Sequence, residues 1–239
     1  MTHPASSGSG PLGASPPGPP EPEEVRRAGP LLIAGSLAVV ACVLLLGILA
    51  NAVREQETFW IDTVGNTFMH GFASPTIDTV MGTATFIGRN VVLLALTTGI
   101  AIVLVARRRH REALFLGVVV IGSMLLNSAL KLVFQRPRPV LPWATVPADY
   151  SFPSGHAMNS MAFALGVGVI AWHLLGPRRG AVVLCAAVTA SALIGLSRIY
   201  LGFHYVTDVV AGFATAVVWV AIVIWAFRAA ARRRGNSRT

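Results

Sequence analysis

The sequence predicts an all-α protein, a polytopic membrane helical bundle with six transmembrane helices. Of its 239 residues, 54% are hydrophobic and only 12% are charged, whereas a soluble domain carries about a quarter charged residues. The charges are also unevenly spread. They leave long apolar stretches that approach the roughly 20 residues needed to cross a bilayer core about 30 Å thick.

Six spans follow in order along the chain. Five are predicted from the apolar stretches 31–50, 113–130, 157–175, 181–196 and 209–227, and a sixth lies within 77–106, where Arg89 and Asn90 interrupt it. We therefore expect one membrane domain over 31–231, with a basic cytoplasmic tail over 232–239. Residues 1–30, rich in Pro and Gly, bury too little apolar surface to offset the entropy of ordering, which predicts a disordered cytoplasmic tail.

The region around the first span carries two further signals. Ala50, Asn51 and Ala52 resemble a signal-peptide cleavage site, but the long preceding tail favours a retained anchor. After this span, apolar residues at helical spacing predict an amphipathic helix on the outer leaflet within 54–75. His70 belongs to that segment and is expected to be an interfacial side chain without chemistry.

The formal net charge of +9 reflects topology rather than nucleic-acid binding. Arginine clusters mark every second span boundary, as the positive-inside rule requires of cytoplasmic loops. These clusters are 26–27, 107–109 with 111, 178–179 and 232–234. Both termini are then cytoplasmic, in a membrane that we expect to be a bacterial plasma membrane. Cys42 and Cys185 lie in different spans with no Cys or His at metal spacing, so neither a disulfide nor a zinc site is predicted.

Several cations remain at the predicted outer ends of the spans, against the inside bias, which indicates an anionic partner there. In KLVFQRPRP, Pro137 and Pro139 end the third span, so that Lys131 and Arg138 can reach the same point. In SFPSGH, Ser154 is placed to cap the next helix, and Gly155 allows close backbone approach. His156 then sits in the first helical turn, beside free N–H groups that favour anions.

The third segment, SRIYLGFHYVTD, adds Arg198, His204 and Asp208. The last two are four residues apart and would share one face of a helix. A carboxylate that accepts one ring N–H fixes the tautomer and frees the other nitrogen to attack. A lone interfacial His or a lone Asp usually has no catalytic role. Several ionisable residues gathered on one side of a membrane, in contrast, predict a functional site.

Together the three segments resemble the signature of the type 2 phosphatidic acid phosphatase superfamily, in a bacterial-type membrane member. That superfamily also includes glucose-6-phosphatase, bacterial acid phosphatases and vanadium haloperoxidases. The matching positions are Lys131 with Arg138-Pro139, Pro153-Ser154-Gly155-His156, and Ser197-Arg198 with His204 and Asp208. The resemblance covers roughly residues 60–227.

The resemblance implies roles for these residues. His204 would be the nucleophile, His156 the general acid and base, and Asp208 the residue that orients His204. Phosphate would be bound by Lys131, Arg138, Ser154, Gly155 and Arg198, with no metal and no cofactor. Arg136 lies inside the first block but not at a fixed position, so its role stays open. No role is assigned to His3, His110 or His173.

The implied activity is metal-independent dephosphorylation of a lipid phosphate or diphosphate through a phosphohistidine. Phosphatidic acid, an isoprenoid diphosphate and phosphatidylglycerol phosphate all fit, and the sequence does not choose among them or fix the oligomeric state. Transfer of the phosphoryl group to a lipid or sugar hydroxyl is an alternative with the same first half-reaction. An inactive lipid-phosphate binder would be expected to lack a motif residue, which disfavours that alternative. A haloperoxidase is disfavoured because the haloperoxidases of the superfamily are soluble proteins.

Overall fold

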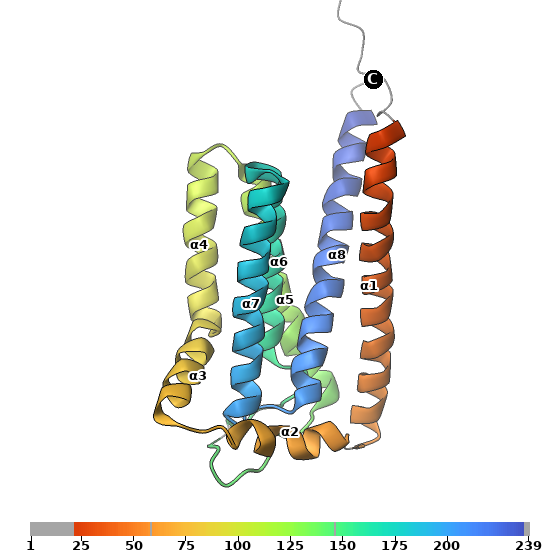
Figure 1. Ribbon diagram of the computed structural model, residues 1–239. Helices are drawn as coiled ribbons and strands as arrows, with labels where there is room; N and C mark the ends of the chain where they lie inside the picture. Colours follow the sequence, from red (N-terminus) through yellow and green to blue (C-terminus); the bar gives the residue numbers. More distant parts are fainter. Residues whose placement is uncertain (1–21, 58, 146, 237–239) are drawn as a thin grey trace, which may run out of the picture. The chain divides into compact units, whose positions relative to one another are not determined.

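The computed structural model describes residues 22–57, 59–145 and 147–236, with the backbone alone for 22–32 and 234–236. The described residues form helices and no strand, which confirms the all-α prediction (Figure 1). The helices are α1 (Pro22–Arg54), α2 (Trp60–His70), α3 (Pro75–Ile87), α4 (Asn90–Ala106), α5 (His110–Phe134), α6 (Gly155–Leu175), α7 (Pro177–Tyr200) and α8 (Val206–Asn236). The chain divides into units 1–37 and 38–239, and the second holds helices α2 to α8 and the site described below.

The predicted number of spans agrees with the helices. Helices α5, α6, α7, α8 and the 33–54 part of α1 are long and apolar enough to cross a membrane. Helices α3 and α4 pass the same test together, bent by 56° at the break between them, so the described helices allow five spans, or six where this pair forms one. The break falls at Gly88 and Arg89, where the sequence predicts an interruption, because the polar Arg89 becomes the N-cap of α4.

Two helices extend into the predicted tail segments, whose disorder and cytoplasmic location stay predictions. Helix α1 begins at Pro22, within the segment expected to be a disordered tail, and α8 continues to Asn236, past the expected start of the basic tail. Basic side chains do not stop a helix, because they can extend into water from its last turns. The rest of both predicted tails, 1–21 and 237–239, lies outside the described residues.

Helix α6 is the centre of the bundle and packs against α5, α7 and α8. Its inner side contributes Met158 and Ala162 to a core with Leu116, Val119 and Val220. Polar bonds supplement this apolar packing, because lipid tails offer no hydrophobic drive for helices to associate. Asn159 of α6 accepts from Ser123 Oγ of α5 at 2.8 Å and donates to Asn90 Oδ1 of α4 at 3.0 Å. Three helices are thereby fixed in register.

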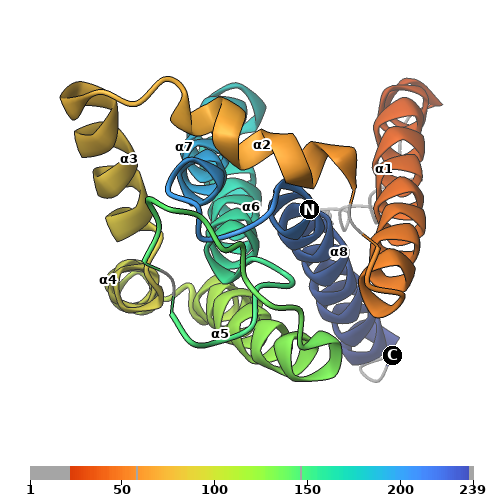
Figure 2. The same ribbon diagram turned by 90° about the horizontal axis from the view of Figure 1, so that it is seen from below.

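Helix α2 runs crosswise to the spans at one end of the bundle, called here the α2 end (Figures 1 and 2). It contacts α7 and α8. Trp60 and Phe68 are exposed on its outer side, whereas Asp62 and Asn66 are buried. The predicted amphipathic helix is therefore present, with its buried face polar and its exposed face apolar, as suits a helix between lipid and a polar site.

A close approach between α8 and the start of α6 gives the first testable prediction. A Cβ at Gly212 would lie 2.7 Å from Ser154 O and 3.1 Å from Met158 N. Because backbone atoms would have to shift, Gly212→Ala is expected to cost ~1–3 kcal/mol, as overpacking does. Thermal unfolding in detergent would report a lower midpoint.

The matched control is Gly99→Ala in α4, where a Cβ meets nothing within 4 Å. Alanine favours a helix by about 1 kcal/mol over glycine, so this control should unfold at the same or a higher temperature. If both variants behaved alike, the close packing of α8 on α6 would be refuted.

Candidate active site

The three motif segments meet at the α2 end. The first follows α5, the second begins α6, and the third is the turn between α7 and α8. Arg138 Nη1 of the first segment lies 3.2 Å from His204 Nε2 of the third and donates to Phe203 O at 2.6 Å. Ser154 N of the second donates to Asp208 O at 3.0 Å. Hydrogen bonds therefore join residues that lie far apart in the chain.

His204 lies in the turn that precedes α8, and the predicted shared helix face with Asp208 is wrong. Helix α7 ends at Tyr200, and Gly202 adopts a left-handed conformation with φ of +72° that starts the turn. The two side chains still meet, because the turn folds back over the first turn of α8. His204 Nδ1 is 3.4 Å from Asp208 Oδ2, within ion-pair distance, and Oδ2 accepts a hydrogen bond from Tyr205 N at 3.0 Å.

The contacts of His204 define its tautomer and charge. A guanidinium has only donors, so Arg138 Nη1 requires a lone pair on Nε2, and the ring proton is then on Nδ1, toward Asp208. Burial lowers the pKa of His204 to about 4, although Asp208 acts in the opposite direction. At neutral pH the site therefore holds an uncharged imidazole with its Nε2 lone pair facing Arg138.

Lys131 and Arg138 reach the same point, as the sequence predicts, and a carboxylate lies between them. Lys131 Nζ is 2.6 Å from Asp149 Oδ2, and Arg138 binds Asp149 Oδ1 through Nη2 at 2.6 Å and Nε at 2.9 Å. Partial burial alone would raise the pKa of Asp149, but the two cations hold it below its usual value. Asp149 was not among the predicted site residues; its one sequence signal is that it is the sole acidic residue in 135–154.

The start of α6 contributes Ser154, Gly155 and His156. Ser154 is the N-cap, but its hydroxyl makes no capping bond, so that prediction is wrong. Its backbone makes the contacts instead, with N–H donating to Asp208 O and the carbonyl accepting from Met158 N. Ser154 Oγ is left buried with no hydrogen-bond partner among the described residues. Gly155 packs closely against the side chain of Asn127, because a Cβ at position 155 would lie 2.8 Å from Asn127 Oδ1.

Arg198 and His156 complete the predicted set. Arg198 is buried, donates from Nη1 to Thr85 Oγ1 and lies over the Phe203 ring at 4.2 Å. Its Nε has no hydrogen-bond partner within the described part of the chain. His156 is half-buried and lies within electrostatic range of Arg198, His204 and Lys131. The site thus gathers donors from three segments around two imidazoles.

A buried ion-pair network behind His204 was missed from the sequence. Arg136, whose role was left open, lies between Asp62 and Asp208, at 2.8 Å and 2.6 Å respectively. Asp62 comes from α2, a helix interpreted only as interfacial. Its sequence signal is weak but real, since it is an acidic residue between the apolar residues of that helix.

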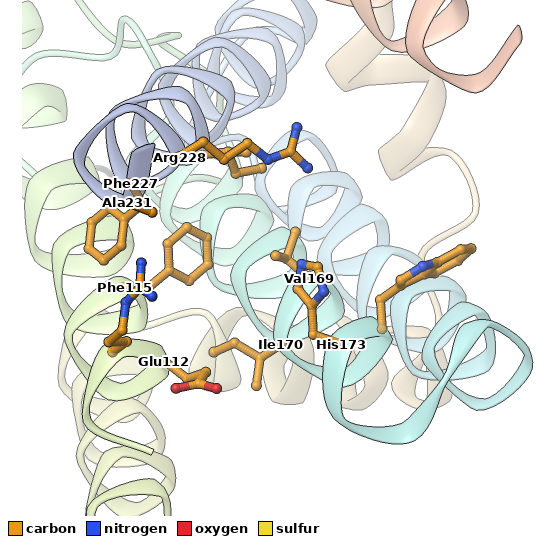
Figure 3. Close-up of a pocket in the computed structure, with 11 residues that line it drawn as sticks. Glu112, Phe115, Val169, Ile170, His173, Phe227, Arg228 and Ala231 are labelled. Atoms are coloured by element: carbon orange, nitrogen blue, oxygen red, sulfur yellow. The ribbon is translucent and has the colours of Figure 1, made fainter. Parts of the chain in front are cut away.

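A cavity of about 580 Å³ lies between α5, α6 and α8 at the opposite end of the bundle (Figure 3). Phe115, Ile170, Phe227, Arg228 and His173 are among its lining residues. None of the predicted site residues borders it. His173, which was given no role, is accordingly remote from the motif segments.

The charge of His204 can be tested directly. Because burial lowers its pKa to about 4, ¹⁵N-histidine NMR in detergent should show the His204 imidazole neutral, protonated on Nδ1, down to about pH 5, where an ordinary histidine is already charged. His204→Gln removes that signal and so assigns it. Protonation of the assigned ring near pH 6.5, the usual histidine value, would contradict the buried, neutral state.

Known proteins match this chain over the same segments. The family described as the PAP2 superfamily matches residues 112–232. Phosphatidylglycerophosphatase B from Bacillus subtilis is 32% identical over 185 residues, which are 75% of this chain and 89% of that protein. Decaprenylphosphoryl-5-phosphoribose phosphatase from Mycobacterium tuberculosis is 35% identical over 135 residues, 55% of this chain and 68% of that protein.

The fold agrees with these matches. The crystal structure of the first transmembrane PAP2 type phosphatidylglycerolphosphate phosphatase from Bacillus subtilis superimposes with a TM-score of 0.68 at 28% identity, covering 77% of this chain and 93% of that one. The family match spans half of the sequence and includes all three motif segments. With its helical membrane fold and the convergence of those segments at the α2 end, this chain belongs to the PAP2 superfamily.

Proposed function

We propose that this protein removes a terminal phosphate from a membrane lipid phosphate or diphosphate through a phosphohistidine on His204. One observation carries the proposal: a buried, neutral imidazole presents the Nε2 lone pair beside the guanidinium of Arg138. The relatives support the substrate class, since their names describe phosphatases of lipid phosphates. Phosphatidylglycerol phosphate, phosphatidic acid and isoprenoid diphosphates remain the candidate substrates.

The first half-reaction forms the bond between His204 Nε2 and phosphorus and breaks the bond between phosphorus and the lipid oxygen. His156 gives its proton to that oxygen, so the lipid leaves as an alcohol, or as a monophosphate from a diphosphate. The imidazole becomes positively charged as Nε2 bonds phosphorus. Asp208, which faces the Nδ1 proton, stabilises that charge.

The second half-reaction returns the enzyme to its starting state. Water attacks phosphorus and gives one proton to His156, which is now able to act as a base. The bond between Nε2 and phosphorus breaks, inorganic phosphate leaves, and His204 is again neutral. The same phosphohistidine could pass its phosphoryl group to a hydroxyl of a lipid or sugar, so free phosphate must be measured against phosphorylated acceptor.

Phosphate binding is assigned to the cations and donors around His204. Lys131, Arg138 and Arg198 can offset the charge on the non-bridging oxygens, and positioned charges supply most of the catalysis in phosphoryl transfer. Ser154 Oγ and Arg198 Nε, which have no partner among the described residues, are further donors together with Gly155 N. This cationic set is the reason to propose a metal-independent reaction, which chelation by EDTA should leave unaffected.

The proposed orientation puts the α2 end at the outer face of the membrane. The arginine cluster at 107–109 lies between α4 and α5, and the cluster at 178–179 lies in the first turn of α7, at the opposite ends of those helices from the motif segments. The positive-inside rule assigns such clusters to the cytoplasm. Substrate would then enter from the outer leaflet, and both termini would be cytoplasmic.

The nucleophile can be tested by substitution. His204→Ala should lose essentially all phosphate release from phosphatidylglycerol phosphate in mixed micelles, because it removes the imidazole that is proposed to take the phosphoryl group. His173→Ala, which lines the distant cavity, is the matched control and should keep wild-type turnover. Wild-type protein should be inhibited competitively by vanadate but not by EDTA. Near-normal turnover by His204→Ala would overturn the assignment.

The position of Asp149 predicts a second effect. Its carboxylate binds both Lys131 and Arg138, so a phosphate that uses both cations must first displace it. Asp149→Asn keeps the shape and removes the charge, and should tighten vanadate inhibition by up to tenfold, or ~1.4 kcal/mol. Because Asp149 is 52% exposed, solvent screening limits the effect. Glu57→Gln, at an exposed carboxylate before α2, is the control; weaker vanadate inhibition of Asp149→Asn would refute this competition.

A further inference from the structure

Helix α2 presents two buried polar side chains to the site from a direction that the three motifs do not include. Asp62 and Asn66 are one helical turn apart and share its inner face, with 3% and 2% exposure. Such burial is costly unless each polar group finds a partner. Asp62 bonds to Thr207 and to Arg136, and Asn66 bonds to the carbonyls of Ile199 and His204, so α2 is tied to the turn that carries the imidazole.

Asp62 binds the first turn of α8 from outside that helix. Its Oδ1 accepts from Thr207 N at 2.9 Å, which satisfies one of the free N–H groups at the start of α8. Its Oδ2 accepts from Arg136 Nη2 at 2.8 Å. Asp62 thus fixes the helix turn that holds Asp208 and also holds the guanidinium that pairs with Asp208.

Arg136 is the link between the two carboxylates. Its Nη1 donates to Asp208 Oδ1 at 2.6 Å and to Thr207 Oγ1 at 2.8 Å, and its guanidinium lies 4.2 Å over the Tyr205 ring. Since Oδ1 of Asp208 is bound in this way, Oδ2 is the oxygen that faces His204 Nδ1. The orientation of the Asp208 carboxylate is therefore set by Arg136 at Oδ1 together with Tyr205 N at Oδ2.

Asn66 fixes the backbone on the same side. Its Nδ2 donates to Ile199 O at 2.8 Å, at the end of α7, and to His204 O at 3.0 Å. The intervening residue Gly65 permits this approach, because a Cβ there would lie 2.5 Å from Val206 Cγ2. Both the main chain and the orienting carboxylate of the nucleophile are consequently held by α2 and its partners.

We propose that Asp62 and Arg136 are positioning residues for the reaction, acting on His204 through Asp208. Two carboxylates around one guanidinium leave a net charge of −1 beside the imidazole. That charge is matched to the positive charge that His204 acquires while phosphorus is bonded to Nε2. Without Asp62, the Arg136–Asp208 pair is neutral as a unit and offers the imidazolium less stabilisation.

The same network extends the role of α2. Its exposed face is apolar and suits contact with lipid, while its buried polar face is proposed to set the geometry of the nucleophile. A helix that is amphipathic by sequence is in this way part of the catalytic framework. The inference rests on the proposed function for its kinetic consequences, but the tautomer of His204 is a readout that does not depend on turnover.

The experiment compares Asp62→Asn and Arg136→Lys with wild type in detergent micelles. Asp62→Asn removes the charge at constant shape, and Arg136→Lys keeps the cation but cannot bind two carboxylates with a planar fork. Both should lower kcat by roughly 10- to 100-fold with little change in KM, as small misplacements of catalytic groups do. Glu57→Gln removes an exposed carboxylate just before α2 and should keep wild-type kcat.

An Asp208→Asn background separates a positioning role from a general structural one. If Asp62 and Arg136 act through Asp208, their substitution should cost less than about twofold once Asp208 is replaced, since groups that act as a unit are not additive. A full, additive loss in that background would overturn the proposal. Thermal unfolding midpoints show whether each variant is folded. If Asp62→Asn does not fold, the comparison is made with Arg136→Lys alone.

The ¹⁵N spectrum of His204 completes the test. Wild type should hold the ring proton on Nδ1, and both variants should shift part of the population to Nε2, because Asp208 no longer holds its oxygen toward Nδ1. An unchanged tautomer with unchanged kcat refutes the positioning role. If the variants shift the tautomer of His204 but the wild-type protein releases no phosphate, the proposed function is refuted. The positioning of His204 by Asp62 and Arg136 is then still supported.

Discussion

The ion pair between Arg136 and Asp208 is the constraint on which the arrangement around His204 depends. Asp208 has no exposed side-chain surface and Arg136 has 8%. Removing one partner from such a pair leaves an uncompensated buried charge, which is far costlier than the pair is favourable. The polypeptide must therefore bring the connection after α5 against the start of α8. That contact places Arg138, two residues after Arg136, beside the imidazole.

Further polar contacts keep these elements in place where apolar packing would allow them to slide. Asn127 Nδ2 of α5 donates to Pro153 O at 3.1 Å, which ties the second motif to the helix that carries Lys131. Ser160 of α6 and Ser191 of α7 share a hydrogen bond of 2.8 Å deeper in the bundle. Such bonds are directional, and the low-dielectric surroundings make an unpaired alternative unfavourable. A site assembled from several helices gains its precision from these contacts.

The sequence predicts the helical class and the spans well, because apolar length and charge position respond directly to the bilayer. It also identifies the residues that meet at the α2 end, since the three motifs are local and each carries its own chemistry. The turn that holds His204 was predicted incorrectly as helix because the spacing of His204 and Asp208 suits both. Gly202, with its left-handed backbone, ends the regular structure there.

What the sequence could not provide is the set of partners that become neighbours only in three dimensions. Helices α3, α4 and α5 lie between Asp62 and Arg136 in the chain. The residues around each of them give no indication that the two side chains form an ion pair. Asp149 is similar, since a single acidic residue in a Pro-rich connection has many possible surroundings. Charge balance is a property of the folded site, and it can be counted only after the neighbours of each ion are known.

The acidic residues of the site differ in how firmly they are held. Asp62 and Asp208 are buried and each has several donors, so they are fixed parts of the charge around His204. Asp149 is half exposed, contacts the cations from the outer side and can return to water at little cost. Cations gathered at one site repel one another, and Asp149 offsets that repulsion; a phosphate bound as proposed would take over this role. The difference in burial thus distinguishes two kinds of counter-ion near the proposed nucleophile. Asp62 and Asp208 are permanent, whereas Asp149 is exchangeable.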